Sequence, residues 1–179
     1  MLAVAGTLTG LAVPLAASAL DEMRTAMAAR YLAGTIVAAR LDALRRSAAV
    51  ALRFESSGDE IGFGVYVDGN GNGIRTADIA SGIDVPQSPR HRLRDHFPAV
   101  RFGLAAGIAD LDDTRRTEED AGVHVGSAGI LTLSPDGTAT SGTLYVRGQR
   151  SQYAVRVLGA TARTRVFQYH AGARAWIAR

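Results

Sequence analysis

The chain has 179 residues, 47% of them hydrophobic and 21% charged, which is enough to form one buried core with an appendage. It contains no cysteine, which excludes a disulfide scaffold, a thiolate nucleophile and a cysteine-ligated metal. All 20 basic residues are arginine, which excludes a P-loop lysine, and the net charge of +3 is too small to indicate nucleic acid by itself.

Residues 1–20 carry no charge and consist mainly of Ala, Leu, Val, Gly and Thr, with a proline at position 14. A run of about 20 uncharged residues is long enough to span a bilayer as a helix. Residues 21–53 continue with strong helix formers and apolar residues at helical spacing. We therefore expect one long helix over residues 1–53, kinked at Pro14. A signal peptide cleaved near Ala19 and a buried helix of a soluble domain are the alternatives.

After residue 53 the sequence changes to short apolar runs separated by turn residues. Strands are expected at residues 61–67, 100–104, 130–133, 143–147, 153–157, 163–169 and 175–177. An extended proline-rich loop is expected at 81–98, and a long exposed acidic loop at 107–128. Because the strands all follow the helix, the predicted class is α+β, with a long hydrophobic N-terminal helix followed by an antiparallel sheet or sandwich over residues 54–179.

Residues 68–73, Asp-Gly-Asn-Gly-Asn-Gly, match the opening half of a calcium-binding loop. In that pattern three side chains and one backbone carbonyl supply oxygen ligands, and an acid completes the site at the twelfth position. That position is the apolar Ile79 here. The candidate ligands are therefore Asp68, Asn70, Asn72, Ile74 and, one place early, Asp78. A metal-free turn between strands is the alternative, and no cofactor other than calcium is predicted.

Arg163 and Arg165 alternate on an expected strand, so both side chains point to one face and are candidates for contacts with phosphate. Three further arginines nearby could extend this positive surface: Arg147, Arg150 and Arg156. A solvated basic face is the alternative interpretation. The acidic residues at 110–120 are either another solvated surface or a site for a partner subunit or cargo.

Four segments carry a resemblance by their order and spacing. They are the apolar helix with a proline inside residues 11–15 that continues to residue 47, the strand and turn at 64–74, the strand and turn at 130–138, and residues 162–166. Together they resemble the GspH/FimT family of minor pseudopilins, which belong to type II secretion and type IV pilus systems. The resemblance covers nearly the whole chain.

The resemblance implies a structural subunit without enzymatic activity, and no catalytic motif is present. The helix, including Leu11, Val13, Pro14 and Leu15, would anchor the chain in the inner membrane and pack in the core of a short periplasmic fibre. An apolar helix rich in small residues suits such packing. Residues 54–179 would form the periplasmic domain. The implied task is to initiate or cap a type II secretion pseudopilus, with other pseudopilins and inner-membrane assembly proteins as partners.

The family is processed at a motif similar to Gly-Phe-Thr-Leu-x-Glu and then N-methylated. Aligned on Pro14, that motif falls upstream of Met1, so prepilin peptidase is an expected partner if the true start lies upstream. Some relatives in DNA-uptake pili contact DNA through Gly-Arg-x-Arg near the C-terminus, and residues 162–165 resemble that motif with alanine at the first position. A DNA-binding minor pilin is thus the second interpretation, and a secreted soluble β-domain protein is the third.

Overall fold

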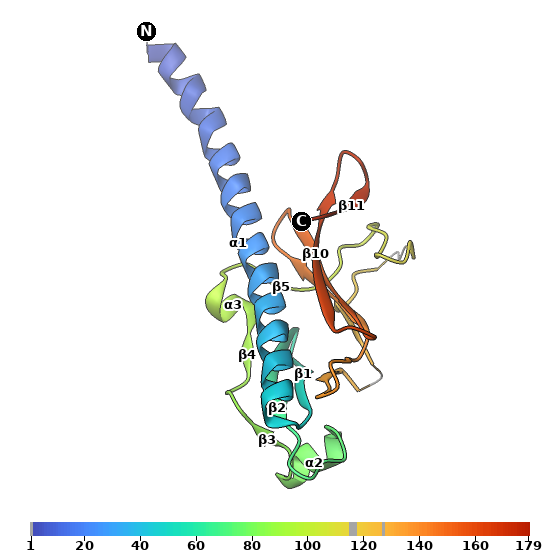
Figure 1. Cartoon of the computed structure of the whole chain (residues 1–179). Helices are drawn as coiled ribbons and strands as arrows, with labels where there is room; N and C mark the ends of the chain where they lie inside the picture. Colours follow the sequence, from blue (N-terminus) through green and yellow to red (C-terminus); the bar gives the residue numbers. More distant parts are fainter. Residues whose placement is uncertain (1, 115–117, 127) are drawn as a thin grey trace.

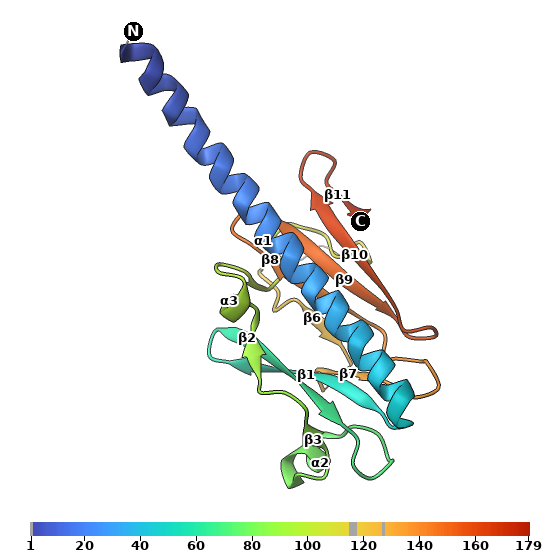
Figure 2. The same ribbon diagram turned by 60° about the vertical axis from the view of Figure 1, so that its left-hand side comes forward.

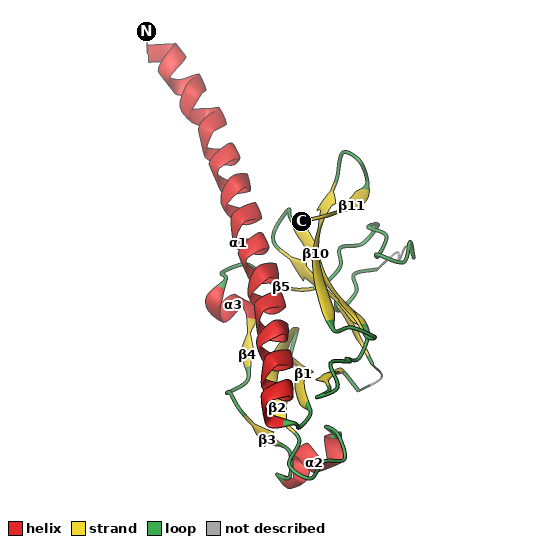
Figure 3. Cartoon of the chain, in the orientation of Figure 1, coloured by secondary structure: helices red, strands yellow, loops and turns green. Residues whose placement is uncertain are grey.

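One long helix packs against two antiparallel sheets in the computed structural model, which describes residues 2–114, 118–126 and 128–179. Side chains of the helix are described from residue 16 onward. The predicted α+β class, with the long helix first and the strands after it, is confirmed. Figure 3 shows the separation of the long helix from the strands, with the two short helices in the connections.

Helix α1, Leu2–Arg46, has 45 residues, or about 67 Å at the usual rise per residue, and it continues through Pro14. Its N-terminal part extends beyond the rest of the molecule, and its C-terminal part lies across the sheets (Figure 1; Figure 2). Among the described residues, no helix is both long enough and apolar enough to cross a membrane.

The helix ends at Arg46, so the expected helical structure up to residue 53 is wrong. Ser47 adopts a positive φ of 52°, and the chain then enters strand β1, Val50–Ser57. Arg45 and Arg46 stabilise the last helical turn, where cations are favourable. The start of β1 was not predicted because residues 48–52 form a continuous apolar run. Periodicity alone does not distinguish such a run from a buried helix.

The remaining elements follow in chain order. They are β2 (Glu60–Val67), α2 (Thr76–Ser81), β3 (Val85–Pro86), β4 (His91–Arg92), α3 (Leu93–His96), β5 (Arg101–Phe102), β6 (Val123–Val125), β7 (Ile130–Leu133), β8 (Gly142–Arg147), β9 (Gln152–Leu158), β10 (Arg163–His170) and β11 (Ala175–Ala178). The first sheet has the order β3-β2-β1-β7, with β4 also paired to β2. The second has the order β11-β10-β9-β8-β5, with β6 also paired to β8.

Helix α1 covers the main core by contacting β1 and β7 of the first sheet and β8, β9 and β10 of the second. Leu32 and Ile36 of the helix are fully buried against residues such as Leu52 and Phe63 from one sheet and Val155 from the other. Each such side chain contributes about 1.5–3 kcal/mol by leaving water. The helix is therefore an integral part of the folded domain from residue 21 onward.

The exposed loop expected at residues 107–128 is confirmed in part: residues 112–114 and 118–119 are exposed, whereas residues 108–111 and 122–125 lie against the second sheet. The main chain of this acidic segment is bound to the outer face of the second sheet, because Leu111 N donates to Tyr145 Oη at 2.9 Å and Trp176 Nε1 donates to the Ala109 carbonyl at 2.8 Å. Ile108 and Leu111 also pack into a small apolar cluster around Tyr145. Residues 123–125 form β6, so this segment is a cover for the sheet.

Candidate assembly surface on the N-terminal helix

The inner face of α1 is built from small and branched apolar residues at helical spacing. Its fully or nearly buried members are Ala28, Ala29, Leu32, Ile36, Ala39 and Ala43. Four alanines in this set allow the helix backbone to approach the strands closely. This face fixes the rotation of α1 on the sheets and thereby determines which residues point away from them.

Asp21 fixes the position of α1 along its own axis. Its carboxylate reaches the turn between β8 and β9, where Oδ1 accepts from Gln149 N at 2.7 Å. Oδ2 accepts from Arg150 N and Ser151 N, both at 3.0 Å, and from Ser151 Oγ at 2.8 Å. Consecutive backbone N–H groups of a turn form a concave site for an anion, and here the anion is a side chain of the same molecule.

The approach of α1 to this turn requires glycine at position 148. A Cβ there would lie 2.3 Å from Thr25 Oγ1 and 2.5 Å from Asp21 Oδ1. Thr25 is fully buried, and its hydroxyl donates to the Asp21 carbonyl at 2.7 Å. The helix and the turn therefore fit together only with no side chain between them.

Burial opposes ionisation of Asp21 and by itself would raise the pKa, but the hydrogen bonds from Gln149, Arg150 and Ser151 lower the pKa below its ordinary value. Asp21 is only 9% exposed and lies just after the uncharged segment of residues 1–20. The ionised form is the one that the turn binds.

The outer face of α1 is apolar and exposed. Of the ten exposed large hydrophobic residues among the described side chains, six lie on this helix and are between 39% and 55% exposed: Leu20, Met23, Met27, Val37, Leu41 and Leu44. They follow alternating steps of three and four residues, with Arg30 and Gly34 at the intervening positions of the series. This spacing is the a/d pattern by which helices pack side by side. We call these eight positions the outer stripe.

The outer stripe lies on the side of α1 opposite the buried face, because residues 32 and 41 are nine positions, or about two and a half turns, apart. A helix with a single apolar face can bury that face against its own domain and needs no partner molecule. Helix α1 has a second apolar face that no described residue covers, and large exposed apolar patches mark interaction sites.

The predicted calcium ligands lie in a loop organised by backbone hydrogen bonds. Asp68 Oδ1 accepts from Asn70 N and Gly71 N at 3.1 and 2.8 Å, and Oδ2 accepts from Gly73 N at 2.7 Å. Asn70 Oδ1 accepts from Asn72 N at 3.2 Å. Ile74 is buried in an apolar cluster. Of these predicted ligands, Asp68 and Asn70 therefore serve as local acceptors.

Asp78, the candidate for the acidic ligand, lies on α2 and is half-buried. Asp84 is fully buried and is also a local acceptor, since its carboxylate accepts from Gly69 N at 3.2 Å and Arg75 N at 3.0 Å. No group of three or more His, Cys, Asp or Glu residues with metal-site geometry occurs in the described part of the chain. Calcium binding stays a prediction.

The basic residues of the second sheet fall into two groups. Arg147 and Arg156 form ion pairs with Glu119 and Asp112 of the acidic segment, which also helps to hold that segment on the sheet. Arg163 and Arg165 are exposed and form no ion pair with any described residue. The wider positive surface anticipated from the sequence is thus partly neutralised, and the two candidate arginines are its free part.

The side chains of Leu11, Val13, Pro14 and Leu15 lie outside the described part of the structure, although their backbone belongs to α1. Sequence reasoning missed Asp21, Gly148 and Ser151, because the sequence does not show which turn will face a lone carboxylate some 130 residues away. The a/d spacing of the outer stripe can be recognised in the sequence. The exposure of these residues cannot, because it depends on how α1 packs on the sheets.

Comparison of the chain with protein-family models, with curated proteins and with solved structures yields no match.

Proposed function

We propose that this chain is a pilin-like minor subunit, anchored in the inner membrane through residues 1–20, that helps to initiate or cap a type II secretion pseudopilus. The observation that carries the proposal is the outer stripe on α1, an apolar face that points away from the chain's own sheets. A structural subunit of a fibre needs such a second face, because its helix must pack on its own domain and on neighbouring helices at once.

Two further features support a structural role. The Asp21 contact with the β8–β9 turn fixes α1 to the domain, so force or displacement applied to the helix is transmitted to the sheets. The N-terminal part of α1 extends beyond the domain, where it is free to enter a membrane or a helical bundle (Figure 1). Its content of Ala, Gly and Thr suits close packing between helices.

The absence of cysteine makes site-specific cross-linking a direct test. Single-cysteine variants Val37→Cys and Leu41→Cys place a thiol on the outer stripe, and Asp59→Cys places one in the exposed β1–β2 turn as the matched control. In the cells that produce the protein, we expect the two stripe variants to cross-link to pilin-like subunits identified by mass spectrometry. The control should not. Equal cross-linking of all three variants to other subunits would contradict the proposal.

The native N-terminus tests the processing that the proposal requires. Mass spectrometry of protein from the membrane fraction should find a methylated residue encoded upstream of Met1. An exported soluble protein that begins near Leu20 would instead establish a secreted β-domain protein, for which residues 20–46 are an ordinary domain helix.

A second candidate function is DNA binding by a type IV minor pilin, favoured by the exposure of Arg163 and Arg165 and their lack of an acidic partner among the described residues. Filter binding over a salt series tests it. The double variant Arg163→Gln with Arg165→Gln should weaken binding to all sequences and reduce the salt slope by about one per lost phosphate contact. Binding that is unchanged in this variant excludes the patch.

A further inference from the structure

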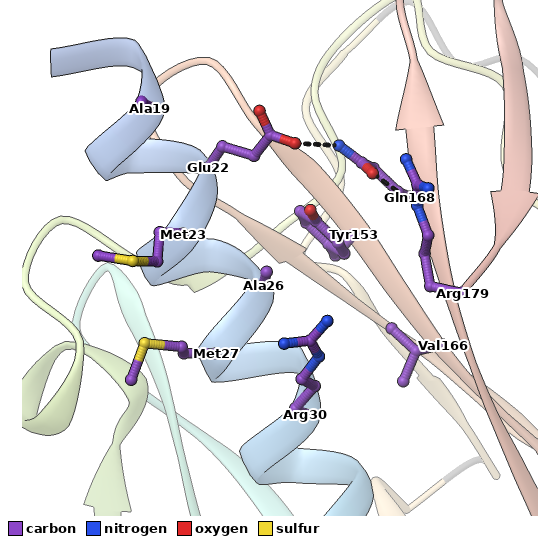
Figure 4. Close-up of a pocket in the computed structure, with 10 residues that line it drawn as sticks. All are labelled: Ala19, Glu22, Met23, Ala26, Met27, Arg30, Tyr153, Val166, Gln168 and Arg179. Carbon is purple, nitrogen blue, oxygen red and sulfur yellow. Dashed lines mark hydrogen bonds between the residues drawn. The ribbon is translucent and has the colours of Figure 1, made fainter. Parts of the chain in front are cut away.

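A groove of about 550 Å³ lies between α1 and the strands β9 and β10 of the second sheet (Figure 4). It follows the helix from Ala19 to Arg30, which is about 16 Å at the helical rise. Met23, Met27 and Arg30 belong both to this groove and to the outer stripe. A helix that packs on the stripe at this level would therefore also meet the groove.

Arg30 is the only charged residue among the eight positions of the outer stripe. It is exposed and forms no ion pair with any described residue. A cation inside a helix–helix interface is strongly unfavourable unless it is paired and hydrogen-bonded. A partner that covers the stripe must either leave this guanidinium in water or bring an acid to it.

A second guanidinium, that of Arg179, approaches the same groove. Arg179 Nε donates to Gln168 Oε1 at 2.8 Å, and Gln168 Nε2 donates to Glu22 Oε1 at 2.8 Å. This chain of contacts orients Arg179 and binds one oxygen of Glu22, whose carboxylate also lines the groove. Neither Arg30 nor Arg179 forms an ion pair with an acid among the described residues. Figure 4 shows Arg30 reaching out from α1, and Arg179 beside Gln168 on the sheet side of the groove.

Tyr153 lines the groove between the two arginines and Glu22. The residue as a whole is only 5% exposed, but its hydroxyl is not one of the fully buried polar atoms that lack a partner among the described residues. The hydroxyl can therefore donate to an acceptor that enters the groove, which Arg30 and Arg179 also line.

We propose that the groove receives a helix of a different subunit whose apolar face carries one carboxylate, and that Arg30, Arg179 and Tyr153 bind this carboxylate. The inference rests on the proposed function, in that the occupant is a neighbouring subunit of the same assembly. The methionines at the rim provide flexible apolar contact for the rest of the helix, and the arginines provide charge-assisted hydrogen bonds.

A second copy of this chain that docks through its own outer stripe does not supply the required carboxylate. Residues 1–20 are uncharged, and the outer stripe contains no acid. The acidic side chains beside the stripe on α1 already have partners: the β8–β9 turn binds Asp21, Gln168 binds Glu22 Oε1, and Arg45, Arg46 and Gln87 bind Asp42. Packing of two outer stripes would therefore leave Arg30 without an acid, which favours a helix of a different chain as the neighbour at this site.

The test uses the full chain in detergent and two fluorescent amphipathic helical peptides that differ only by Glu or Gln at the centre of the apolar face. We expect the Glu peptide to bind about ten-fold more tightly than the Gln peptide, in line with a charge-assisted contact. Arg30→Gln combined with Arg179→Gln should abolish this preference, and Tyr153→Phe should reduce it. The matched control, Arg163→Gln combined with Arg165→Gln, should retain it. Both pairs are exposed, so folding is preserved.

Equal affinity of the wild-type chain for the two peptides would overturn the proposal, and so would a preference that survives in the Arg30/Arg179 variant. Vesicles of phosphatidylglycerol and of phosphatidylcholine form a separate arm. If the two arginines promote binding to the anionic vesicles while the peptides are not distinguished, the cations serve a lipid surface and the proposal is wrong.

The outcome is separable from that of the proposed function. Cross-linking through Leu41→Cys together with no Glu preference would leave the subunit assignment intact and remove the acidic-helix site. A clear preference for the Glu peptide with no cross-linking of the outer stripe would support the acidic-helix site and contradict the subunit assignment.

Discussion

Asp21 on helix α1 and Ser151 in the β8–β9 turn are 130 residues apart in the sequence, and the Ser151 hydroxyl donates to Asp21 Oδ2 at 2.8 Å. With the three backbone donors of the same turn, this contact joins α1 to the end of the β8–β9 hairpin of the second sheet. The exposed part of α1 is thereby held in one position relative to the sheets, which a helix used as an assembly surface requires.

Replacement of Asp21 by asparagine should lower the free energy of unfolding by about 2–3 kcal/mol. The amide keeps the shape, but it loses the charge and one acceptor oxygen, and it leaves buried donors of the turn unpaired. Urea unfolding followed by the fluorescence of Trp176, the only tryptophan, measures the change. Asp59→Asn, at an exposed turn, is the control and should change the value by less than about 0.5 kcal/mol. Equal effects of the two variants would show that the contact is not stabilising.

The stability conferred by Asp21 should disappear in acid. The pKa of this carboxylate is lowered in the folded state, so the unfolded chain takes up the proton first as the pH falls. The contribution is therefore complete above the ordinary aspartate pKa of about 3.9 and is lost as the pH falls through the folded-state value. The difference in unfolding free energy between wild type and Asp21→Asn should be constant near neutral pH and shrink below about pH 4. If the difference in unfolding free energy between the two proteins grows as the pH falls, the prediction is wrong.

Glycine substitutions separate close contact from helix propensity. Gly148→Ala should lower the unfolding free energy by about 1–3 kcal/mol, because the new methyl group meets Thr25 and Asp21. Gly34→Ala adds the same methyl group to α1, where nothing lies within 4 Å. Because alanine favours the helix more than glycine does, this variant should raise the unfolding free energy by up to about 1 kcal/mol. Thermal unfolding of both variants checks the opposite signs. A neutral Gly148→Ala variant would mean that the turn moves freely away from the helix.

The sequence allowed prediction of the parts of the fold that depend on local pattern. The hairpin of β8 and β9 and the strand β7 follow from alternation and turn residues. Strand β1 was missed because its apolar run continues the helix pattern. Asp112 and Glu119 are exposed, as their charge indicates, but their ion pairs with Arg156 and Arg147 of the sheet could not be predicted. Such long-range pairings, like that of Asp21, depend on the topology and leave no local signal.

Tyr145 should report whether residues 109–111 remain attached to the second sheet. Its buried hydroxyl accepts from Leu111 N at 2.9 Å, and burial raises the pKa of Tyr145 from 10 to about 12. Because the folded-state pKa is the higher one, its contribution to stability is present below about pH 10 and is lost as the pH rises toward 12. Burial also raises the pKa of Tyr153, so alkaline titration of tyrosinate absorbance should show a high-pH step near 12 that loses one tyrosine's amplitude in Tyr145→Phe and keeps it in the control Tyr66→Phe. If Tyr145→Phe leaves that step unchanged, the hydroxyl is open to solvent and this segment is not held by it.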